Sequence, residues 1–228
     1  MKITKYTHAA MFLESNGAKL WIDPSQISPD TPDDLTGVVA IVFTHNHFDH
    51  YSPEFTKKVA AKNPNLEIFA SNQTVNQLHA DFPDFDNAKL HRADEGSGFV
   101  ISNFSLSFFG GRHAHILPND DKGDNVGVVV SSGNSALLYP GDSFDVPAGD
   151  SLTENYTLAL PISGPWLKIG ESMEYLRNIK PSPKIVFPTH DAMLSEMGWR
   201  SACASLENVA HEIDAKLVAL KPGESTEM

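Results

Sequence analysis

The stretch Thr44–His50, read THNHFDH, places four residues of metal-binding types within six positions: His45, His47, Asp49 and His50. His45 and His47 are two positions apart, so in strand geometry their imidazoles project to the same side. Asp49 and His50 would then leave the strand end in a turn and aim at a second point. Such a cluster can hold two divalent cations about 3.5 to 4 Å apart, the separation found in binuclear hydrolases.

Three later segments carry further candidate ligands, each at the point where a predicted strand opens into a loop. They are His113 or His115 in GGRHAH, Asp142 in YPGDS and His190 in FPTHD. Taken singly, each has an ordinary structural alternative, since an aspartate, for example, can cap a turn. Two catalytic metal ions need about six protein ligands or more, so it is the joint arrangement that favours a metal site.

The elements that must position these residues read as strands, followed by strands and helices in alternation, and this pattern occurs twice. The run Val38–Phe43 is apolar without alternation, which suits a strand covered on both faces, and Asn16-Gly17 predicts a tight hairpin turn. Strands are predicted over 3–8, 10–14, 19–23, 38–43, 66–70, 98–102, 104–109, 126–131, 136–139, 158–161, 184–187 and 217–220, and helices over 53–62, 72–79, 171–179 and 199–216. This order predicts an α/β body of two sheets packed face to face, with helices on both outer surfaces and loops gathered at one edge.

Composition limits the class of protein in which this chemistry would operate. With 228 residues and 41% hydrophobic content, the chain can form one large globular domain, and no repeat or low-complexity tract divides it. A formal charge of −12 without a visible Lys/Arg stripe disfavours nucleic acid as a partner, and no apolar run approaches the roughly 18 residues of a membrane span. The first residues do not resemble a signal peptide and Cys203 is the single cysteine, so we expect a cytoplasmic protein with a small-molecule substrate.

The full set of candidate ligands resembles the signature of the metallo-β-lactamase superfamily, which is HxHxDH followed by separated His, Asp and His ligands. The resemblance spans nearly the whole chain. It implies a four-layer αββα sandwich, with two mixed sheets face to face and helices outside, built as a single domain over 1–228 from two similar halves, about 1–110 and 111–228. It also implies a binuclear site at one edge, in which His45, His47 and His113 hold one metal ion, Asp49, His50 and His190 hold the other, and Asp142 bridges them.

Within the superfamily, the sequence is most similar to the branch of metal-dependent hydrolases that includes the ascorbate-6-phosphate lactonase-like proteins. The matching features are His8 ahead of FLE…G…LWIDP, DHYSPE after the metal motif, and the run GGRHAHI…DNVG. Both histidines of that run are candidates for the third ligand of the first metal. The branch favours His113 over His115, because it usually shows HA after a glycine-containing turn.

The resemblance implies a binuclear hydrolase that acts on a small lactone, ester, amide or phosphoester. The imidazole-rich ligand set favours two Zn²⁺ ions, with Mn²⁺ or Fe also compatible, and two such cations would lower the pKa of a bridging water so that hydroxide is the nucleophile. Asp49 is the expected catalytic residue, because it can orient that water and accept its proton. The alternatives are a phosphodiesterase or nuclease on the same fold, and a non-catalytic protein that binds metal and a metabolite.

Other residues are candidates for supporting roles around the metals. Asp23 and Asp191 lie in strand-end segments, where each could accept the outer ring N–H of a ligand imidazole or act as an ordinary turn residue. His8 is either a hydrogen-bonded strand-end histidine or a contact to a ligand or to substrate. The candidate pocket walls are Phe48, Tyr51 and the loop Gly164-Pro165-Trp166. For these aromatic side chains, core packing is the alternative.

Overall fold

The computed structural model describes residues 1–117, 123–148 and 152–227, and the strands of these ranges form two seven-stranded sheets. The first sheet has the order β14 (Ser225–Glu227), β1 (Lys2–Lys5), β2 (Met11–Ser15), β3 (Ala18–Ile22), β4 (Val38–Phe43), β5 (Glu67–Ala70) and β6 (Leu90–Arg92). The second has the order β13 (Lys216–Leu217), β12 (Ile185–Thr189), β11 (Tyr156–Pro161), β10 (Ser135–Tyr139), β9 (Gly127–Ser132), β8 (Phe104–Phe109) and β7 (Gly98–Ile101).

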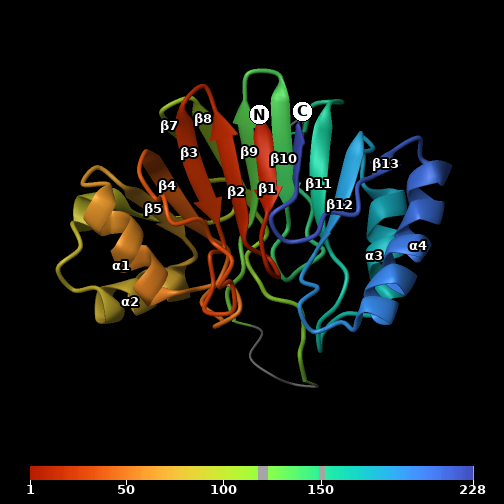
Figure 1. Ribbon diagram of the computed structural model, residues 1–228, viewed down its shortest axis with the longest axis horizontal. Coiled ribbons are helices and arrows are strands. Elements are labelled where there is room, and N and C mark those ends of the chain that lie inside the picture. Colours follow the sequence, from red (N-terminus) through yellow and green to blue (C-terminus); the bar gives the residue numbers. More distant parts are fainter. Residues whose placement is uncertain (118–122, 149–151, 228) are drawn as a thin grey trace.

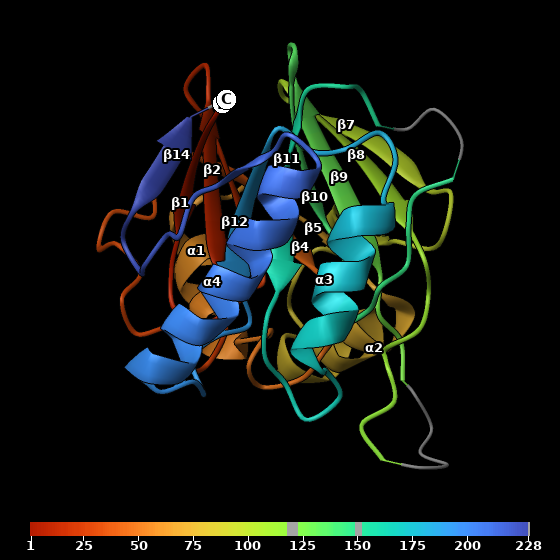
Figure 2. The ribbon, with the colours of Figure 1, turned by 90° about the vertical axis from the view of Figure 1, so that its right-hand side faces the viewer.

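Helices cover the outer face of each sheet (Figures 1 and 2). The helices are α1 (Pro53–Lys62) and α2 (Asn72–Asp81) on the first sheet, α3 (Ile169–Asn178) and α4 (Glu196–Glu212) on the second, and the short 3-10 helix η1 (Asn87–Lys89) before β6. Phe55 and Val59 of α1 join a buried cluster with Ile41 of β4, whereas Leu206 of α4 joins a separate cluster with Leu158 of β11. The predicted four-layer αββα sandwich is therefore confirmed.

Both sheets are mixed, and they share one plan. In the first sheet β1, β2 and β3 pair antiparallel and β3 to β6 pair parallel, while in the second β7 to β10 pair antiparallel and β10 to β13 pair parallel. The predicted division between the two halves lies near residue 110. Sheet membership changes earlier, between Arg92 and Gly98, and β14 returns to the first sheet, where it pairs antiparallel with β1.

The strand β4 is covered on both faces, which explains its continuous apolar run. Ala40 and Val42 belong to the core between the two sheets, whereas Ile41 and Phe43 belong to the core beneath α1. All four side chains are completely buried. Because burying a large apolar side chain stabilises a fold by about 1.5–3 kcal/mol, β4 is a rigid mount for the residues that follow Phe43.

Several elements differ from the sequence prediction: the strand predicted over 3–8 ends at Lys5, two edge strands were not predicted, and one helix has different bounds. β6 and β14 were not predicted, because these three-residue strands have few buried side chains and are held mainly by backbone pairing. The helix predicted over 199–216 begins at Glu196, since the Ser195 hydroxyl accepts the N–H of Gly198 and caps it, and ends at Glu212. The strand predicted after it is only the two-residue β13.

The loops that follow β4, β8, β10 and β12 lie at one edge of the sandwich, the lower edge in Figure 1, and both chain ends lie at the opposite edge. These loops contain the candidate ligands, so the fold gathers them where the strands end. Among the helices of the described ranges, none has the length and apolar character needed to span a bilayer.

Candidate metal centre

The HxHxDH segment begins directly after β4 and turns back on itself. The backbone N–H groups of His50 and Tyr51 both donate to the carbonyl of His47, at 2.9 Å each. This turn separates the first pair of candidate ligands from the second. His45 and His50 are buried, Asp49 is half-buried and His47 is exposed, so the cluster opens to solvent on the side of His47.

The loops after β8, β10 and β12 bring the remaining candidates to this segment. Metal-binding atoms lie within 4.8 Å of one another in three overlapping groups: His45, His47 and His113; His45, His50 and Asp142; and His8, Asp49, His50 and His190. These groups contain all seven predicted ligands and add His8. The two histidines left open by the sequence are separated here, because His113 is buried within a group whereas His115 is exposed and belongs to none of the three.

Asp142 lies at the centre of the cluster. Its Oδ2 atom is 3.3 Å from Nε2 of His113 and 3.0 Å from Nε2 of His190, and its Oδ1 atom is 3.2 Å from Nε2 of His50. Oδ2 also lies 3.9 Å from Nε2 of His45. One carboxylate therefore faces imidazoles of both predicted metal positions, as a bridging ligand requires.

Hydrogen bonds on the outer side of three imidazoles direct their Nε2 atoms into the cluster. Nδ1 of His50 donates to Oδ2 of Asp23 at 2.8 Å, and Nδ1 of His113 donates to the carbonyl of Ala114 at 2.6 Å. The Thr44 hydroxyl donates to Asp23 at 2.6 Å and is left to accept from Nδ1 of His45 at 3.0 Å. A ring whose one remaining proton is on Nδ1 can present its Nε2 lone pair to a metal.

A tight loop fixes the bridging carboxylate. Gly141 has φ 65°, and a Cβ at this position would lie 2.3 Å from Oδ1 of Asn125, so only glycine fits. Asn125 accepts the N–H of Asp142 at 2.9 Å and donates to the carbonyl of Pro140 at 2.9 Å. The indole N–H of Trp166 donates to Oδ2 of Asp142 at 2.9 Å, which gives the predicted pocket-wall residue a direct contact with the metal centre.

Asp191 has a different environment from the one considered in the sequence analysis. Its Oδ1 atom pairs with the Lys5 ammonium at 3.0 Å, and its Oδ2 atom accepts the indole N–H of Trp199 at 2.9 Å. Both oxygens are thus engaged away from the imidazoles. Lys5 is completely buried, and removing one member of such a pair typically costs about 3–5 kcal/mol because a buried charge loses its partner. The pair anchors the segment that carries His190.

The imidazoles on the two sides of Asp142 have opposite pKa shifts. Burial lowers the pKa of His45 well below its ordinary value, and the neighbouring His50 adds to that effect. Burial acts on His50 in the same direction, but the carboxylates of Asp142 and Asp23 outweigh it and raise the pKa of His50 well above the ordinary value. Burial would raise the pKa of Asp142, yet the imidazoles around it, His50 first, hold that pKa well below its usual range.

Several buried polar atoms of the cluster lack hydrogen-bond partners. They are Nε2 of His8, His45, His50, His113 and His190, Nδ1 of His190, and Oδ1 of Asp142. Buried polar atoms are nearly always satisfied in native proteins, so this group of unsatisfied atoms around one point needs an explanation. Imidazole nitrogens and a carboxylate are ligands for divalent transition metals, and metal ions would satisfy Nε2 of the four predicted ligand histidines and Oδ1 of Asp142 at once. The residues therefore fit a metal centre.

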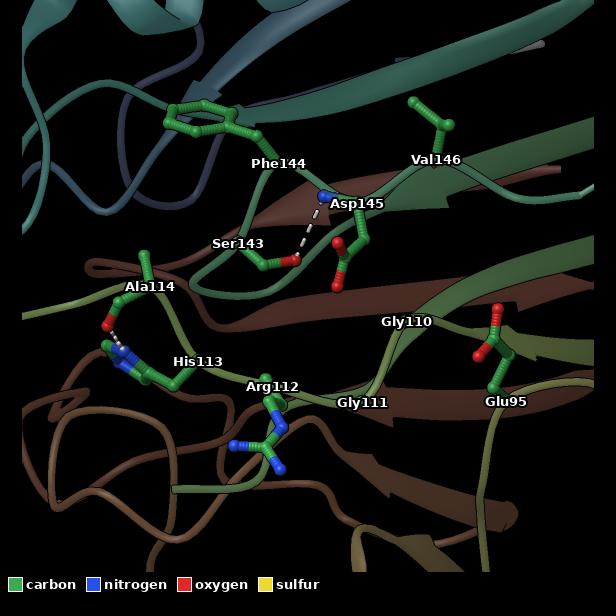
Figure 3. Close-up of a pocket in the computed structure, with 10 residues that line it drawn as sticks. All are labelled: Glu95, Gly110, Gly111, Arg112, His113, Ala114, Ser143, Phe144, Asp145 and Val146. Carbon is green, nitrogen blue, oxygen red and sulfur yellow. Dashed lines mark hydrogen bonds between the residues drawn. The ribbon is translucent and has the colours of Figure 1, made fainter. Parts of the chain in front are cut away.

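A cavity of about 810 Å³ adjoins the centre at His113 (Figure 3). Its charged lining residues come from three segments: Glu95 before β7, Arg112 after β8 and Asp145 after β10. Gly110 is needed at its wall because it has φ 70° and a Cβ there would lie 2.4 Å from Oδ2 of Asp145. The cavity has the size of a small-molecule site.

The predicted wall residues Phe48 and Tyr51 have different positions. Phe48 is 61% exposed, whereas Tyr51 is only 3% exposed. The Tyr51 ring packs edge-on against Phe43, and its hydroxyl donates to Asp81 at 3.0 Å. Tyr51 therefore packs in the core beneath α1, which is the alternative noted for the aromatic residues.

Sequence reasoning missed three supporting residues: Lys5, Asn125 and Tyr139. Tyr139 is fully buried with its hydroxyl 3.5 Å from Nδ1 of His50, and burial, with Asp23 next, raises the pKa of Tyr139 well above its ordinary value. Asn125 and Lys5 had a detectable signal, because each is a polar residue at or beside an apolar strand. Tyr139, as the last residue of an apolar run, had none.

Comparisons with known proteins agree with this geometry. A family model described as a beta-lactamase superfamily domain matches residues 2–190. Protein Rv0786c of Mycobacterium tuberculosis is 30% identical over 197 residues, which cover 86% of each chain. A UPF0173 metal-dependent hydrolase of Aeropyrum pernix is 26% identical over 83% of this chain and 81% of its own.

The fold is also similar to that of Igni18, a metallo hydrolase of Ignicoccus hospitalis. The two structures align with a TM-score of 0.71 and 19% identity over 100% of this chain and 98% of the other. The ligand signature, the four-layer sandwich and the match to the family model all lead to the same assignment. This chain belongs to the metallo-β-lactamase superfamily.

Proposed function

We propose that the protein is a binuclear metal-dependent hydrolase of a small lactone, ester, amide or phosphoester. The observation that carries the proposal is the convergence of buried, unsatisfied Nε2 atoms from four histidines on the Asp142 carboxylate. Relatives that are named metal-dependent hydrolases support the hydrolase class. In this proposal His45, His47 and His113 hold one cation, Asp49, His50 and His190 hold the other, and Asp142 bridges them.

In this proposal the residues of the chain have two roles, which are to hold the cations and to accept a proton. When bound, two divalent cations would supply a water of near-neutral pKa and polarise the substrate oxygen under attack. Asp49 would orient that water and accept its proton, and its half-buried position leaves it within reach of solvent and substrate. Trp166 keeps the Asp142 carboxylate oriented through its indole N–H, and Asp23 does the same for His50.

The chemistry of the donor set favours zinc, and the charge of the chain favours a small substrate. Three neutral imidazoles at one position are a ligand set typical of catalytic Zn²⁺. The formal charge of −12 would repel a nucleic-acid backbone. The cavity beside His113 carries Arg112 on one side and Asp145 on another, which suits a compact polar substrate. We further propose the cytoplasm as its location, where the unpaired Cys203 would stay reduced.

The test combines metal analysis with an activity panel on the same preparation. Protein expressed with added zinc is expected to hold close to two metal ions per chain and to hydrolyse at least one of four substrate classes: sugar lactones, β-lactams, thioesters and phosphodiesters. The His113→Ala variant should lose metal and activity, whereas the matched His115→Ala variant, changed at an exposed histidine outside the groups, should keep both. Metal content well below one ion per chain would exclude the proposal. Full metal content without turnover would favour a non-catalytic metal-binding role.

A further inference from the structure

His8 differs from three of the predicted ligands in what its outer ring nitrogen contacts. Nδ1 of His45, His50 and His113 each faces an oxygen that can accept a hydrogen bond. Nδ1 of His8 faces a donor instead, the backbone N–H of Ala192 at 3.3 Å. A ring nitrogen that accepts an N–H carries no proton, so His8 is neutral and its hydrogen is on Nε2.

A histidine that binds a metal through Nε2 needs its hydrogen on Nδ1, whereas the hydrogen of His8 is on Nε2. A ring nitrogen of His8 lies within 4.8 Å of ligand atoms of Asp49, His50 and His190, and its Nε2 faces Asp49, so its position alone would make it a further ligand of the second metal. With its hydrogen on Nε2, however, His8 has no lone pair to offer there and can only donate. The acceptor that Nε2 faces is Oδ2 of Asp49 at 3.3 Å, but the pair is not aligned as a hydrogen bond, so Nε2 is a buried group without a hydrogen-bond partner among the described residues. Because a buried N–H is rarely left unpaired, this orientation favours a contact with Asp49.

The backbone holds His8 in this place firmly. His8 is 1% exposed and has φ 66° in the turn between β1 and β2, a conformation that side chains other than glycine seldom adopt. The turn is closed by the N–H of Tyr6 donating to Ala10 at 2.8 Å, and the carbonyl of His8 accepts the N–H of His190 at 3.1 Å. The His8 ring also packs on the His190 ring, with centroids 3.9 Å apart. Strained backbone that the surroundings enforce in this way is typical of functional positions.

We propose that His8 is a positioning residue that donates from Nε2 to Oδ2 of Asp49 and binds no metal itself. The contact fixes one oxygen of the Asp49 carboxylate, which limits its rotation and prepares it for metal binding and proton transfer. The inference rests on the metal centre of the proposed function, but the location of the hydrogen is a property of the chain with or without metal.

The first experiment measures the protonation of the ring directly. Long-range ¹H–¹⁵N NMR on protein labelled at its ten histidines reports which nitrogen of each ring carries hydrogen. The His8 signals are those that disappear in the His8→Gln variant. We expect a protonated Nε2 and a bare Nδ1 in both metal-free and zinc-loaded protein, whereas His50 in the zinc-loaded protein should show the reverse pattern. A protonated Nδ1 with a metal-bound Nε2 on His8 would overturn the proposal.

The second experiment separates positioning from ligation by titration with zinc alone. His8→Ala should reach the same number of ions per chain as the native protein at saturating zinc, with the second ion bound roughly 10- to 100-fold more weakly, as is usual when a residue that orients a ligand is removed. His8→Gln, whose amide N–H can take the place of Nε2–H, should recover most of that loss. The matched ligand variant His50→Ala should lose one ion outright.

The outcomes distinguish this inference from the proposed function. If His8→Ala loses one ion at saturating zinc, as His50→Ala does, and His8→Gln is no better, then His8 is a ligand and the inference is wrong while the metal centre stands. If the native protein binds no metal, the proposed function fails, and the NMR of the metal-free chain still decides the location of the hydrogen on His8.

Discussion

The two proposed metal positions differ in the charge of the residues that form and surround them. The first is made of three histidines, of which His45 and His113 are oriented by an uncharged hydroxyl and a backbone carbonyl. The second includes the carboxylate of Asp49, and its His50 is backed by the carboxylate of Asp23. The ligands of the first position would neutralise less of the metal's positive charge, so a metal there would polarise a substrate oxygen more strongly. The second position would bind its metal more strongly once its ligands have lost their protons.

The largest effect is expected at Asp142, because this residue is common to both proposed metal positions. Asp142→Asn removes the negative charge that faces His50, His113 and His190 together, so both metal positions should weaken and kcat/KM should fall by more than the roughly 100-fold typical of residues that only orient a ligand. Metal analysis and kinetics on the best substrate of the panel measure this, with circular dichroism to confirm that the fold persists. A variant that keeps both ions and native turnover would show that Asp142 does not bridge.

Asp49→Asn should separate the two positions. The first position contains no contact to Asp49 in its ligand group, so the variant should keep close to one ion per chain, while turnover falls by orders of magnitude because the proton acceptor is lost. Metal content and kcat are the measurements, and His115→Ala serves as the control that changes neither. Loss of both ions in Asp49→Asn would mean that the positions bind metal as a single unit.

A smaller and more selective effect is expected from Asp23→Asn. Removing the carboxylate behind His50 should weaken the second ion by roughly 10- to 100-fold and the first ion less. The first is not wholly independent, because Asp23 also accepts the Thr44 hydroxyl, which in turn accepts from His45. Competition with a chelator gives the two dissociation constants. Equal weakening of both would show that this hydrogen-bond chain, rather than the local charge, controls metal affinity.

The smallest effect is a difference in proton release on metal binding. The pKa of His50 is raised well above 6.5, so His50 carries a proton at pH 7 that metal must displace, whereas the pKa of His45 is lowered well below 6.5 and this ring is already neutral. Filling the second position should therefore release about one more proton than filling the first, and its affinity should fall more steeply as the pH is lowered. Calorimetry in buffers of different ionisation enthalpy measures the protons, with Asp49→Asn reporting the first position alone. Equal release in both titrations would contradict the assignment.

The sequence could predict which side chains gather at one edge better than it could predict their partners. The candidate ligands follow strand ends, so the order of strands was enough to bring His45, His113, Asp142 and His190 together. Asp23 and Asp191 have the same kind of sequence position, yet Asp23 binds a ligand imidazole while Asp191 pairs with a lysine 186 residues away in the chain. The direction in which a carboxylate faces depends on such distant contacts, which local pattern does not encode.

The role of His8 also depends on a distant contact, because that contact determines which ring nitrogen carries the hydrogen. The sequence left its role open between a strand-end histidine and a contact of the site. Its environment is decided by Ala192, a backbone group on the other sheet's loop, at a separation of 184 residues. Residue type and spacing indicate that a histidine can bind metal, but the tautomer that we propose for His8 depends on this distant partner.

The pairing of β14 with β1 has a consequence for how the protein is made. Ile3 pairs with Leu13 on one side and with Thr226 on the other, so β1 is an edge strand until residues 225–227 have left the ribosome. Its outer backbone groups are then open to pairing with other chains, a known route to aggregation. Because the contact spans almost the whole chain, it should also form late in folding. Shortening the chain before Ser225 would therefore be expected to lower the yield of soluble protein while leaving every proposed metal ligand in place.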